Sequence, residues 1–364
     1  MLSKQILYRT IRSIHEVVQS GCSVWNTQGD LLVSEGNHCE IKRQDVTDFL
    51  KSDASKTKEF YEIKDEYSMF AVCDEGEPDY VFVLEQGGNE AIVSGKLCVI
   101  QLEGLINMNK EKMDRNRFIQ NLILDNLLVV DIYNQAKKLS IQNEQKRVVI
   151  LIEPKDPRDL IVQDTVRGLY TAGTGDYVTA VDEGHVILVK ALQETDDYKE
   201  ILQLVEMLVD IINTEAMVNV RVAYGTIVKE LKDVPQSYKE ALMALNVGRI
   251  FYEEKNILAY KELGIGRLIH QLPSSLCKMF LDEIFAGKGL EQFDDETLST
   301  VDKFFENNLN ISETARQLYV HRNTLVYRLE KIQKQTGLDV RKFEDAMTFK
   351  IALMVSDHMK FVKE

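Results

Sequence analysis

The sequence has little proline, little cysteine and no long apolar run. Only 5 prolines occur in 364 residues, and no low-complexity tract is present, so floppy linkers between domains are not expected. The five cysteines are scattered without a Cys-x-x-Cys pair, which argues against a zinc site and a disulfide framework. No apolar run approaches the roughly 20 residues that span a bilayer. The N-terminal stretch becomes polar too early for a signal peptide, so we expect a cytoplasmic protein with no membrane partner.

Positive charge is also scarce. The chain has 44 Lys and Arg against 58 Asp and Glu, a net charge of −14 at pH 7. This balance argues against a protein that coats nucleic acid with its whole surface, but it is compatible with one basic face. Hydrophobic residues make up 45% and charged residues 28%, which is typical of folded rather than disordered chains. At roughly 150 residues per domain, the length predicts two or three domains.

Residues 1–99 mix helix and strand signals. An amphipathic helix carries Ile6, Ile11 and Ile14 on one face. Short strands are predicted on both sides of the turn 27–30, and at 69–73 and 80–84. A helix, a meander and a further helix are typical of a PAS- or GAF-like sensor domain, which we assign to 1–99. Residues 100–140 are predicted as linker helices, two rather than one, because Asn and Lys at 107–112 interrupt the apolar face.

Residues 141–265 show the clearest alternation of strands and helices. Strands are predicted at 147–152, 177–181, 185–190 and 218–224, and helices up to 170 and at 198–215 and 235–248. Asp182-Glu183-Gly184 marks a hairpin turn between two of these strands. The order βαββαβ predicts a ferredoxin-like domain. We expect residues 266–293 to be a connector and 294–364 to be all helical, which makes the whole chain a multidomain α+β protein.

The segment 310–332 has the spacing of a helix-turn-helix. In a short first helix, Ile311, Ala315 and Leu318 line one face, and Asn310 or Ser312 can cap its start. Asn310 with Glu313 also fits the capping-box pattern. A turn around Tyr319-Val320 follows. A second helix then places three apolar residues on one buried stripe: Leu325, Leu329 and Ile332.

The other face of the second helix is polar. Arg322, Asn323, Thr324, Tyr327 and Arg328 are predicted to point outward from its N-terminal half, and these side chains suit phosphates and base edges. Between residues 311 and 343, seven basic and three acidic residues give a local charge of +4. A solvated amphipathic hairpin is the alternative interpretation. We predict a DNA-binding site formed by Arg316, His321, Arg322, Asn323, Thr324, Tyr327, Arg328 and Lys331, with His321 either contacting phosphate or capping the helix.

The block LYVHRNTLVYRL at 318–329 closely resembles the signature of the C-terminal helix-turn-helix in the PucR/CdaR family, bacterial transcription regulators of the sugar-diacid and purine-catabolism type. The flanking helices at 298–307 and from Phe343 onward fit as well. Residues 223–245 and 259–269 are similar to the family's central domain, and 116–128 to its linker, so the resemblance covers about 116–364. It implies sequence-specific DNA binding and a GGDEF-like central domain.

The resemblance raises the question of whether the central domain is an enzyme. A diguanylate cyclase needs two glycines at the hairpin and acidic residues to hold Mg²⁺ on the nucleotide phosphates. The hairpin here, 180–185, lacks the glycine pair, although Asp182 and Glu183 are acidic and Glu153 and Asp156 follow the first strand. We therefore expect a degenerate domain, with no enzymatic activity and no cofactor. A signalling enzyme or a nucleotide-binding protein that uses this domain is the alternative.

Other motifs add little chemistry. Sequences of the types GxxxxGK[ST], HExxH, GxSxG and GxGxxG are absent. His38 beside Cys39 is a weak metal-ligand pair, and the other histidines have no second ligand at metal spacing, so no metal site is predicted. An accessory protein whose C-terminal hairpin binds another protein is a third interpretation. It is disfavoured because a protein-binding face would more often expose Leu, Met or Phe.

The predicted partners follow from charge and from the family. About three cations of one motif can reach phosphate at once, whereas the rest of the chain repels DNA, so we expect a homodimer on an inverted-repeat operator. The resemblance implies control of a catabolic or transport operon, with a lean toward activation and hence contact with RNA polymerase. A small-molecule effector is expected to bind the N-terminal domain, and a purely structural or protein-binding role of this domain is the alternative. That domain lacks the Ile-Gly-x-x-His stretch of the sugar-diacid branch, and Trp25, Arg43, Tyr61 and Tyr67 are the pocket candidates.

Overall fold

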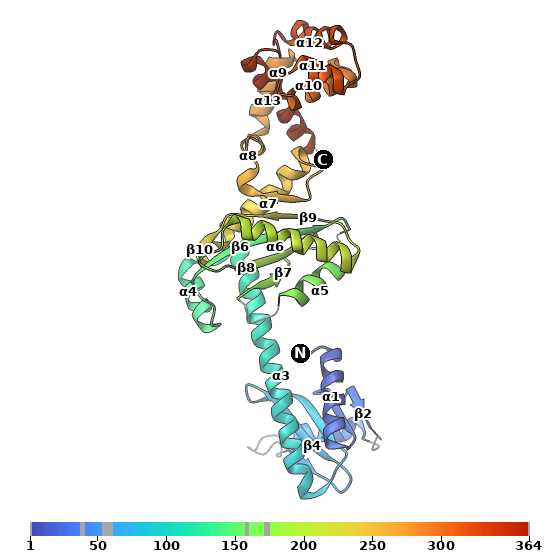
Figure 1. The fold of residues 1–364 in the computed structure, drawn as a ribbon. Coiled ribbons are helices and arrows are strands. Elements are labelled where there is room, and N and C mark those ends of the chain that lie inside the picture. Colours follow the sequence, from blue (N-terminus) through green and yellow to red (C-terminus); the bar gives the residue numbers. More distant parts are fainter. Residues whose placement is uncertain (1, 37–40, 53–60, 157–159, 171–174, 363–364) are drawn as a thin grey trace. The chain divides into compact units, whose positions relative to one another are not determined.

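A computed structural model describes residues 2–36, 41–52, 61–156, 160–170 and 175–362 of the chain. The fold is mixed α+β, with two sheets and a C-terminal part made of helices (Figure 1). The chain divides into two compact units, Met1–Phe118 and Ile119–Glu364.

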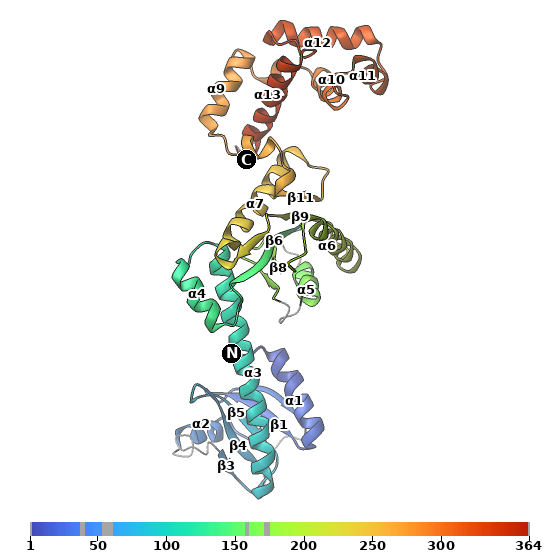
Figure 2. The same cartoon turned by 60° about the vertical axis from the view of Figure 1, so that its left-hand side comes forward.

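The N-terminal unit is built on one antiparallel sheet in the order β2-β1-β5-β4-β3 (Figure 2). Alternate residues of its strands enter two different cores because successive side chains of a strand point to opposite faces. Phe70 and Phe82 pack beneath helices α1 and α3, whereas Met69 and Val81 pack beneath α2. The elements are α1 (Lys4–Val18), β1 (Cys22–Asn26), β2 (Leu31–Glu35), α2 (Arg43–Lys51), β3 (Tyr61–Ile63), β4 (Ser68–Asp74), β5 (Glu77–Leu84) and α3 (Gly88–Ile123).

The long helix α3 corrects one prediction. Residues 107–112 do not break it, and the next helix, α4 (Val129–Lys138), begins only after 124–128. The polar residues at 107–112 interrupt an apolar stripe, but they face outward or find partners: Asn107 is exposed, and Lys110 Nζ lies 2.7 Å from Glu75 Oε1. Lys and Glu are good helix formers, so a polar interval costs the helix little. Among the described residues, α3 is also the one helix long and apolar enough to cross a membrane by length and composition alone.

The second unit begins with the predicted ferredoxin-like domain. Its main sheet has the order β11-β9-β6-β8-β7, in which β6 lies between β9 and β8 and is antiparallel to both, as the split arrangement requires. The predicted elements are β6 (Glu144–Pro154), α5 (Leu160–Leu169), β7 (Tyr177–Thr179), β8 (Val186–Ala191), α6 (Tyr198–Ile211), β9 (Val220–Tyr224) and α7 (Val234–Phe251). Two short strands were not predicted: β10 (Val228–Glu230), which pairs with β6, and β11 (Ile257–Ala259), which is parallel to β9.

The helices cover both faces of this sheet. Val162 and Val166 of α5 and Val205 and Leu208 of α6 share one apolar core with alternate residues of β6, β8 and β9. Helix α7 packs against β6 and β9, and Ser237 Oγ accepts a hydrogen bond from the Val149 amide at 3.0 Å. Gly225, which ends β9 as predicted, is required here because a Cβ would lie 2.0 Å from the Ser237 carbonyl oxygen. The close approach of α7 therefore explains this glycine.

The chain ends in helices without strands among its described residues, as predicted for 294–364. They are α8 (Gly266–His270), α9 (Ser274–Phe285), α10 (Asp295–Glu306), α11 (Ile311–Gln317), α12 (Arg322–Thr336) and α13 (Phe343–Phe361). Phe285, Phe293 and Phe349 meet edge to face at centroid distances of 5.9–6.2 Å and form the centre of the core. Helix α9, from the predicted connector, contributes Cys277 to a cluster with Ile269 and Val355.

Candidate nucleic-acid interface

The short helix α11 is capped by Asn310, one of the two residues predicted to cap it. Asn310 Oδ1 accepts a hydrogen bond from the Glu313 amide at 3.1 Å, which satisfies one of the open donors at the helix start. The Glu313 carboxylate does not complete a capping box, because it accepts instead from Arg316 Nη2 at 2.7 Å and from Gln317. Ala315 is buried where α11 crosses α12, while Ile311 and Leu318 are half-buried.

The turn between α11 and α12 presents a side chain that the sequence did not point out. Tyr319 adopts a left-handed backbone (φ 54°) and is 96% exposed. The Val320 amide donates to the Ala315 carbonyl at 3.0 Å, which closes the turn. A left-handed residue that is not glycine is uncommon, and its side chain is directed away from both helices' packing faces. The turn position was visible in the sequence, but the exposure of the ring depends on this backbone conformation.

Helix α12 buries the predicted stripe and exposes its N-terminal half. Leu325, Leu329 and Ile332 are fully buried, which confirms their prediction as core residues. His321 caps the helix, because its Nδ1 accepts a hydrogen bond from the Asn323 amide at 3.2 Å. The outward side chains at the helix start are exposed, as predicted: Arg322, Asn323, Thr324 and Tyr327. An arginine, an amide, a hydroxyl and a phenol thus stand together at the N-terminal end of a rigid helix.

Arg328 does not point outward as predicted. Its side chain is 19% exposed and turns toward α10, where Nη1 donates to Thr300 Oγ1 at 3.0 Å and Nη2 to Glu296 Oε2 at 2.7 Å. One turn further along, Lys331 Nζ lies 2.5 Å from Asp294 Oδ2. The hydrogen bond from Lys331 holds the pKa of Asp294 well below its usual range. Arg328 and Lys331 therefore fasten α12 to the N-terminal turn of α10.

The cations of this region differ in what they contact. Arg316 is exposed but pairs with Glu313, and this contact raises the Arg316 pKa. No ion pair or side-chain hydrogen bond of Arg322 occurs within the part of the chain that the structure describes. Because its guanidinium is already exposed and has no protein partner to give up, Arg322 can meet a phosphate or a base edge without breaking a contact.

The hairpin of the ferredoxin-like domain is polar in a different way. His185 Nδ1 lies 2.9 Å from Asp182 Oδ1, and its Nε2 lies 3.6 Å from Glu153 Oε1. Arg249 of α7 forms an ion pair with the same Glu153 carboxylate. Glu153 and His185 are mostly covered, whereas Glu183 is exposed at the turn. The carboxylate at the end of the first strand of this domain thus already has a cationic partner within the protein, Arg249.

Metal ligands do not gather among the described residues, where no three His, Cys, Asp or Glu side chains are placed to hold one ion. The weak pair His38 and Cys39 lies outside the residues that the structure describes. In the hairpin region, Asp182 Oδ1 lies 2.9 Å from His185 Nδ1, and Glu153 is paired with Arg249.

The four side chains predicted to line an effector pocket all contact other residues of the N-terminal unit. Trp25 is buried and donates from Nε1 to Ser23 Oγ at 2.9 Å, and Arg43 Nε donates to the Gln28 carbonyl at 2.9 Å. Tyr67 accepts from Lys64 Nζ at 3.1 Å, and Tyr61 stacks on Phe70. None of these four lines the cavity of about 240 Å³ that lies between the start of the chain, the β4–β5 turn and α3.

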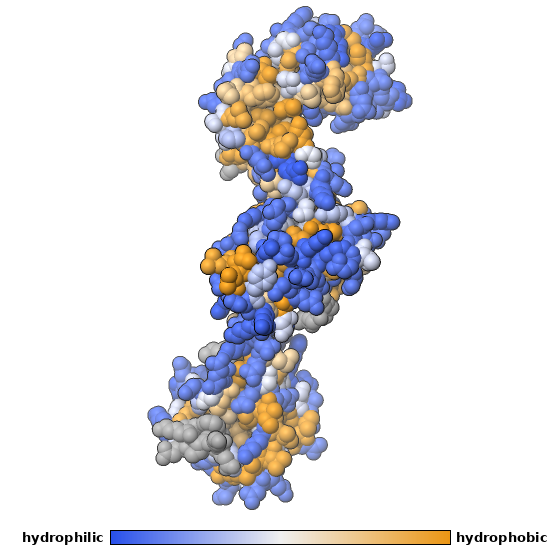
Figure 3. Space-filling model, turned by 90° about the vertical axis from the view of Figure 1, so that its left-hand side faces the viewer, coloured by the Kyte–Doolittle hydropathy of each residue, from blue (hydrophilic) through white to orange (hydrophobic). Residues whose placement is uncertain are grey.

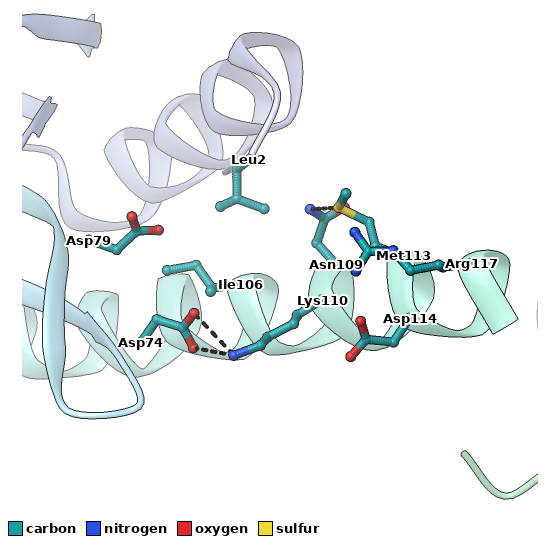
Figure 4. A pocket seen from close by; sticks show the side chains of 9 residues that line it. All are labelled: Leu2, Asp74, Asp79, Ile106, Asn109, Lys110, Met113, Asp114 and Arg117. Atoms are coloured by element: carbon teal, nitrogen blue, oxygen red, sulfur yellow. Dashed lines mark hydrogen bonds and ion pairs between the residues drawn. The ribbon is translucent and has the colours of Figure 1, made fainter. Parts of the chain in front are cut away.

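Figure 4 shows that this cavity has charged walls of both signs. Asp74, Asp79 and Asp114 contribute carboxylates, and Lys110 and Arg117 contribute cations. Lys110 Nζ lies 3.3 Å from Asp74 Oδ2 across one side of it. The residues come from separate elements and carry no recognisable spacing, so the sequence offered no signal for this cavity.

Two parts of the chain match known domain families. Residues 297–355 match the PucR C-terminal helix-turn-helix domain, and residues 126–247 match a GGDEF-like domain. The first range contains α11 and α12, and the second contains the β7–β8 hairpin. The family resemblance predicted from the sequence is therefore confirmed for both domains.

Two characterised relatives are similar over about three quarters of the chain, and a third is similar over about one third of it. The purine catabolism regulatory protein of Bacillus subtilis (strain 168) is 25% identical over 295 residues, which are 76% of this chain and 54% of that protein. The carbohydrate diacid regulator of Escherichia coli (strain K12) is 24% identical over 293 residues, 78% of this chain and 75% of that protein. The DNA-binding transcriptional activator AdeR of B. subtilis is 30% identical over 135 residues, 36% of this chain and 32% of that protein. The chain spans about half the length of the first of these relatives.

Proposed function

The chain belongs to the PucR/CdaR family of bacterial transcription regulators, and we propose that it binds operator DNA and controls a catabolic or transport operon. The observation that carries this proposal is the N-terminal half of α12. It sets Arg322, Asn323, Thr324 and Tyr327 on the exposed side of a helix whose opposite side is locked into a core. A recognition helix reads the major groove with these N-terminal positions.

Within this interface the side chains have different roles, either in contacting DNA or in positioning α12. Arg322 is the direct phosphate or base contact, with Asn323 and Thr324 beside it. Arg316 and Tyr319 flank it from α11 and the turn, where they can meet the DNA backbone. Arg328 and Lys331 act as positioning residues, because their contacts with Glu296 and Asp294 set the angle of α12 on α10. His321 orients the first turn of α12 by capping it.

DNA binding requires two copies of this motif. The chain carries a net charge of −14, and two cations of the predicted site are turned toward α10. About three phosphate contacts per motif give a salt slope near −3, and two motifs give about −5. We infer a homodimer on an inverted repeat whose half-sites lie about 34 Å apart, or a multiple of that.

The proposed regulation consists of effector binding as the input and activation of transcription as the output. A small-molecule effector binds the N-terminal unit, for which the charged cavity beside α3 is the candidate site. The output is activation through RNA polymerase, by analogy with the relative whose name describes an activator. The ferredoxin-like domain carries no catalysis in this scheme, because Arg249 forms an ion pair with the Glu153 carboxylate that a nucleotide-bound metal would need.

Selection of bound DNA from a random pool tests the proposal. The full-length protein should enrich an inverted repeat, and the affinity for it should fall with salt with a slope near −5. Arg322→Ala should reduce the enrichment, while Arg9→Ala, which removes the same charge from an exposed site on α1, should leave it intact. A wild-type protein that enriches no sequence would refute the proposal.

A further inference from the structure

The inner face of α3 is firmly held by the N-terminal unit. Ala91, Cys98, Leu102 and Ile106 are buried in the core between this helix and the sheet. Gly95 lies so close to the Phe70 ring that a Cβ there would meet it at 2.0 Å. The helix therefore has a fixed rotation, and its opposite face is permanently turned away from its own domain.

That opposite face is apolar. Val93, Leu97, Ile100 and Met108 are exposed by 66%, 62%, 64% and 69%, and we call the first three the outer stripe, which Met108 flanks. The first three are spaced by four and three residues, and Gly104 follows four residues later with nothing within 4 Å of the position its Cβ would take. Figure 3 shows apolar residues reaching the surface of the N-terminal unit. A spacing of four, three and four is the seam of two helices packed side by side.

We propose that the outer stripe binds the outer stripe of a second copy of this chain, with the two α3 helices parallel. A two-fold axis along the helices brings each residue of the stripe against its own counterpart, so the surface is complementary to itself. Gly104 permits close approach at the point where the apolar side chains become sparse. The flanking charges do not oppose this register, because both contact their own domain: Lys96 Nζ lies 4.8 Å from the centre of the Tyr61 ring, and Glu103 Oε1 accepts a hydrogen bond from the Cys73 amide at 3.1 Å.

A lipid surface fits α3 less well than a second copy does. A helix that crosses a membrane is surrounded by lipid, whereas the inner half of α3 is buried against its own sheet. The outer stripe also stops at polar residues, since Asn107 and Glu111 occupy the next two positions of the repeat and both are exposed.

The inference rests on the proposed function in one respect. Two copies of α12 are needed on one operator, and parallel pairing directs both chains from the same end of the paired helices toward their C-terminal parts. The pairing itself is a property of the N-terminal unit alone, because the outer stripe lies within residues 93–108. Dimerisation can therefore be measured without DNA.

Sedimentation velocity of the full-length protein without DNA tests the pairing. The wild type should be a dimer, and Leu97→Glu/Ile100→Glu should weaken dimerisation at least about 100-fold, because like charges would face one another across a dry seam. Both side chains are exposed in one protomer, so circular dichroism of the variant should match the wild type. The matched control is Met207→Glu, which places the same charge at an exposed apolar position of α6 and should stay dimeric.

Cysteine cross-linking tests the direction of the helices. Val93→Cys and Ile100→Cys should each form a disulfide with its own counterpart on oxidation. Seven residues separate them by about 10 Å along the helix, so an antiparallel pair can bring at most one of them together. The wild type, whose Cys98 is buried, is the background control.

Several outcomes would overturn the inference. They are a monomeric wild type, a tetramer, a dimer indifferent to Leu97→Glu/Ile100→Glu, and binding of the wild type to phospholipid vesicles that this double variant loses. A monomer that still selects an operator would refute the pairing and leave the proposed function standing. A dimer that selects no DNA would do the reverse.

Discussion

The N-terminal half of α12 and the region of the β7–β8 hairpin are both polar surfaces in the second unit. They differ in whether their charged side chains have partners within the protein. Beside the hairpin, Glu153 of β6 forms an ion pair with Arg249, and Asp182 Oδ1 lies 2.9 Å from His185 Nδ1. On α12, Arg322 is exposed and pairs with no described residue. An exposed charge without a protein partner can bind a charged ligand without first giving up an ion pair, whereas a paired charge cannot. The contrast is the reason for proposing α12, and not the hairpin, as the site that binds a charged ligand.

Removing the core beneath α12 should have the largest effect. Leu325→Ala is expected to lower the free energy of unfolding by about 2–5 kcal/mol, because the residue is fully buried and leaves a cavity. Urea unfolding followed by far-UV circular dichroism measures this loss. The single tryptophan, Trp25, lies in the N-terminal unit, so its fluorescence serves as an internal control that should shift much less. Thr324→Ala, an exposed neighbour, should stay within about 0.5 kcal/mol of the wild type.

Two arginines of α12 then separate reading from positioning. Arg322→Ala should weaken operator binding by about 1–3 kcal/mol in a fluorescence anisotropy titration, with no change in unfolding free energy, since its exposed side chain pairs with no described residue. Arg328→Ala should weaken both binding and stability, because it releases α12 from Thr300 and Glu296. If the two variants lost DNA affinity and stability in the same proportion, the different roles proposed for Arg322 and Arg328 would be wrong.

Mutations in the hairpin region should lower the stability slightly and should remove no enzymatic activity. Glu153→Gln is expected to cost roughly 0.5–1 kcal/mol of stability, because Arg249 loses an ion pair that is partly exposed to solvent. Incubation of the wild type with GTP and Mg²⁺ or Mn²⁺ should yield no cyclic dinucleotide by chromatography. If the wild type formed a cyclic dinucleotide and Asp182→Ala/Glu183→Ala did not, the hairpin would be an active site. The difference proposed here between the hairpin and α12 would then be wrong.

Acid should produce the smallest difference, and it should arise in the helical part. The rings of His270 and His358 lie 5.4 Å apart, and burial lowers the pKa of both. The unfolded chain takes up protons near pH 6.5 while the folded pair stays neutral, so stability should be complete above that pH and fall as the pH drops below it. Urea midpoints at pH 7.5 and 5.5 measure this loss. His270→Gln should reduce the pH dependence, and an unchanged slope would contradict the assignment.

Helix periodicity predicted most of the candidate interface. The stripe Leu325, Leu329 and Ile332 faces the core because residues three and four apart share one side of a helix, and the exposed residues at 322–324 follow from the same rule. The same local logic predicted seven elements of the ferredoxin-like domain, from β6 to α7, but not β10 and β11. It failed for Arg328, whose position on the helix is compatible with either solvent or a neighbour.

The sequence by itself determined which elements form, which side of each is apolar, and the motif that identifies the family. Only the tertiary structure decided which distant residues meet. Glu153 and Arg249 are 96 residues apart, Arg328 and Glu296 are 32 apart, and the short strands β10 and β11 exist through pairing with β6 and β9. Periodicity is a property of neighbouring residues, so it can be read along the chain. The partner of a charge or of a short strand depends on how whole elements pack, and no local pattern records that.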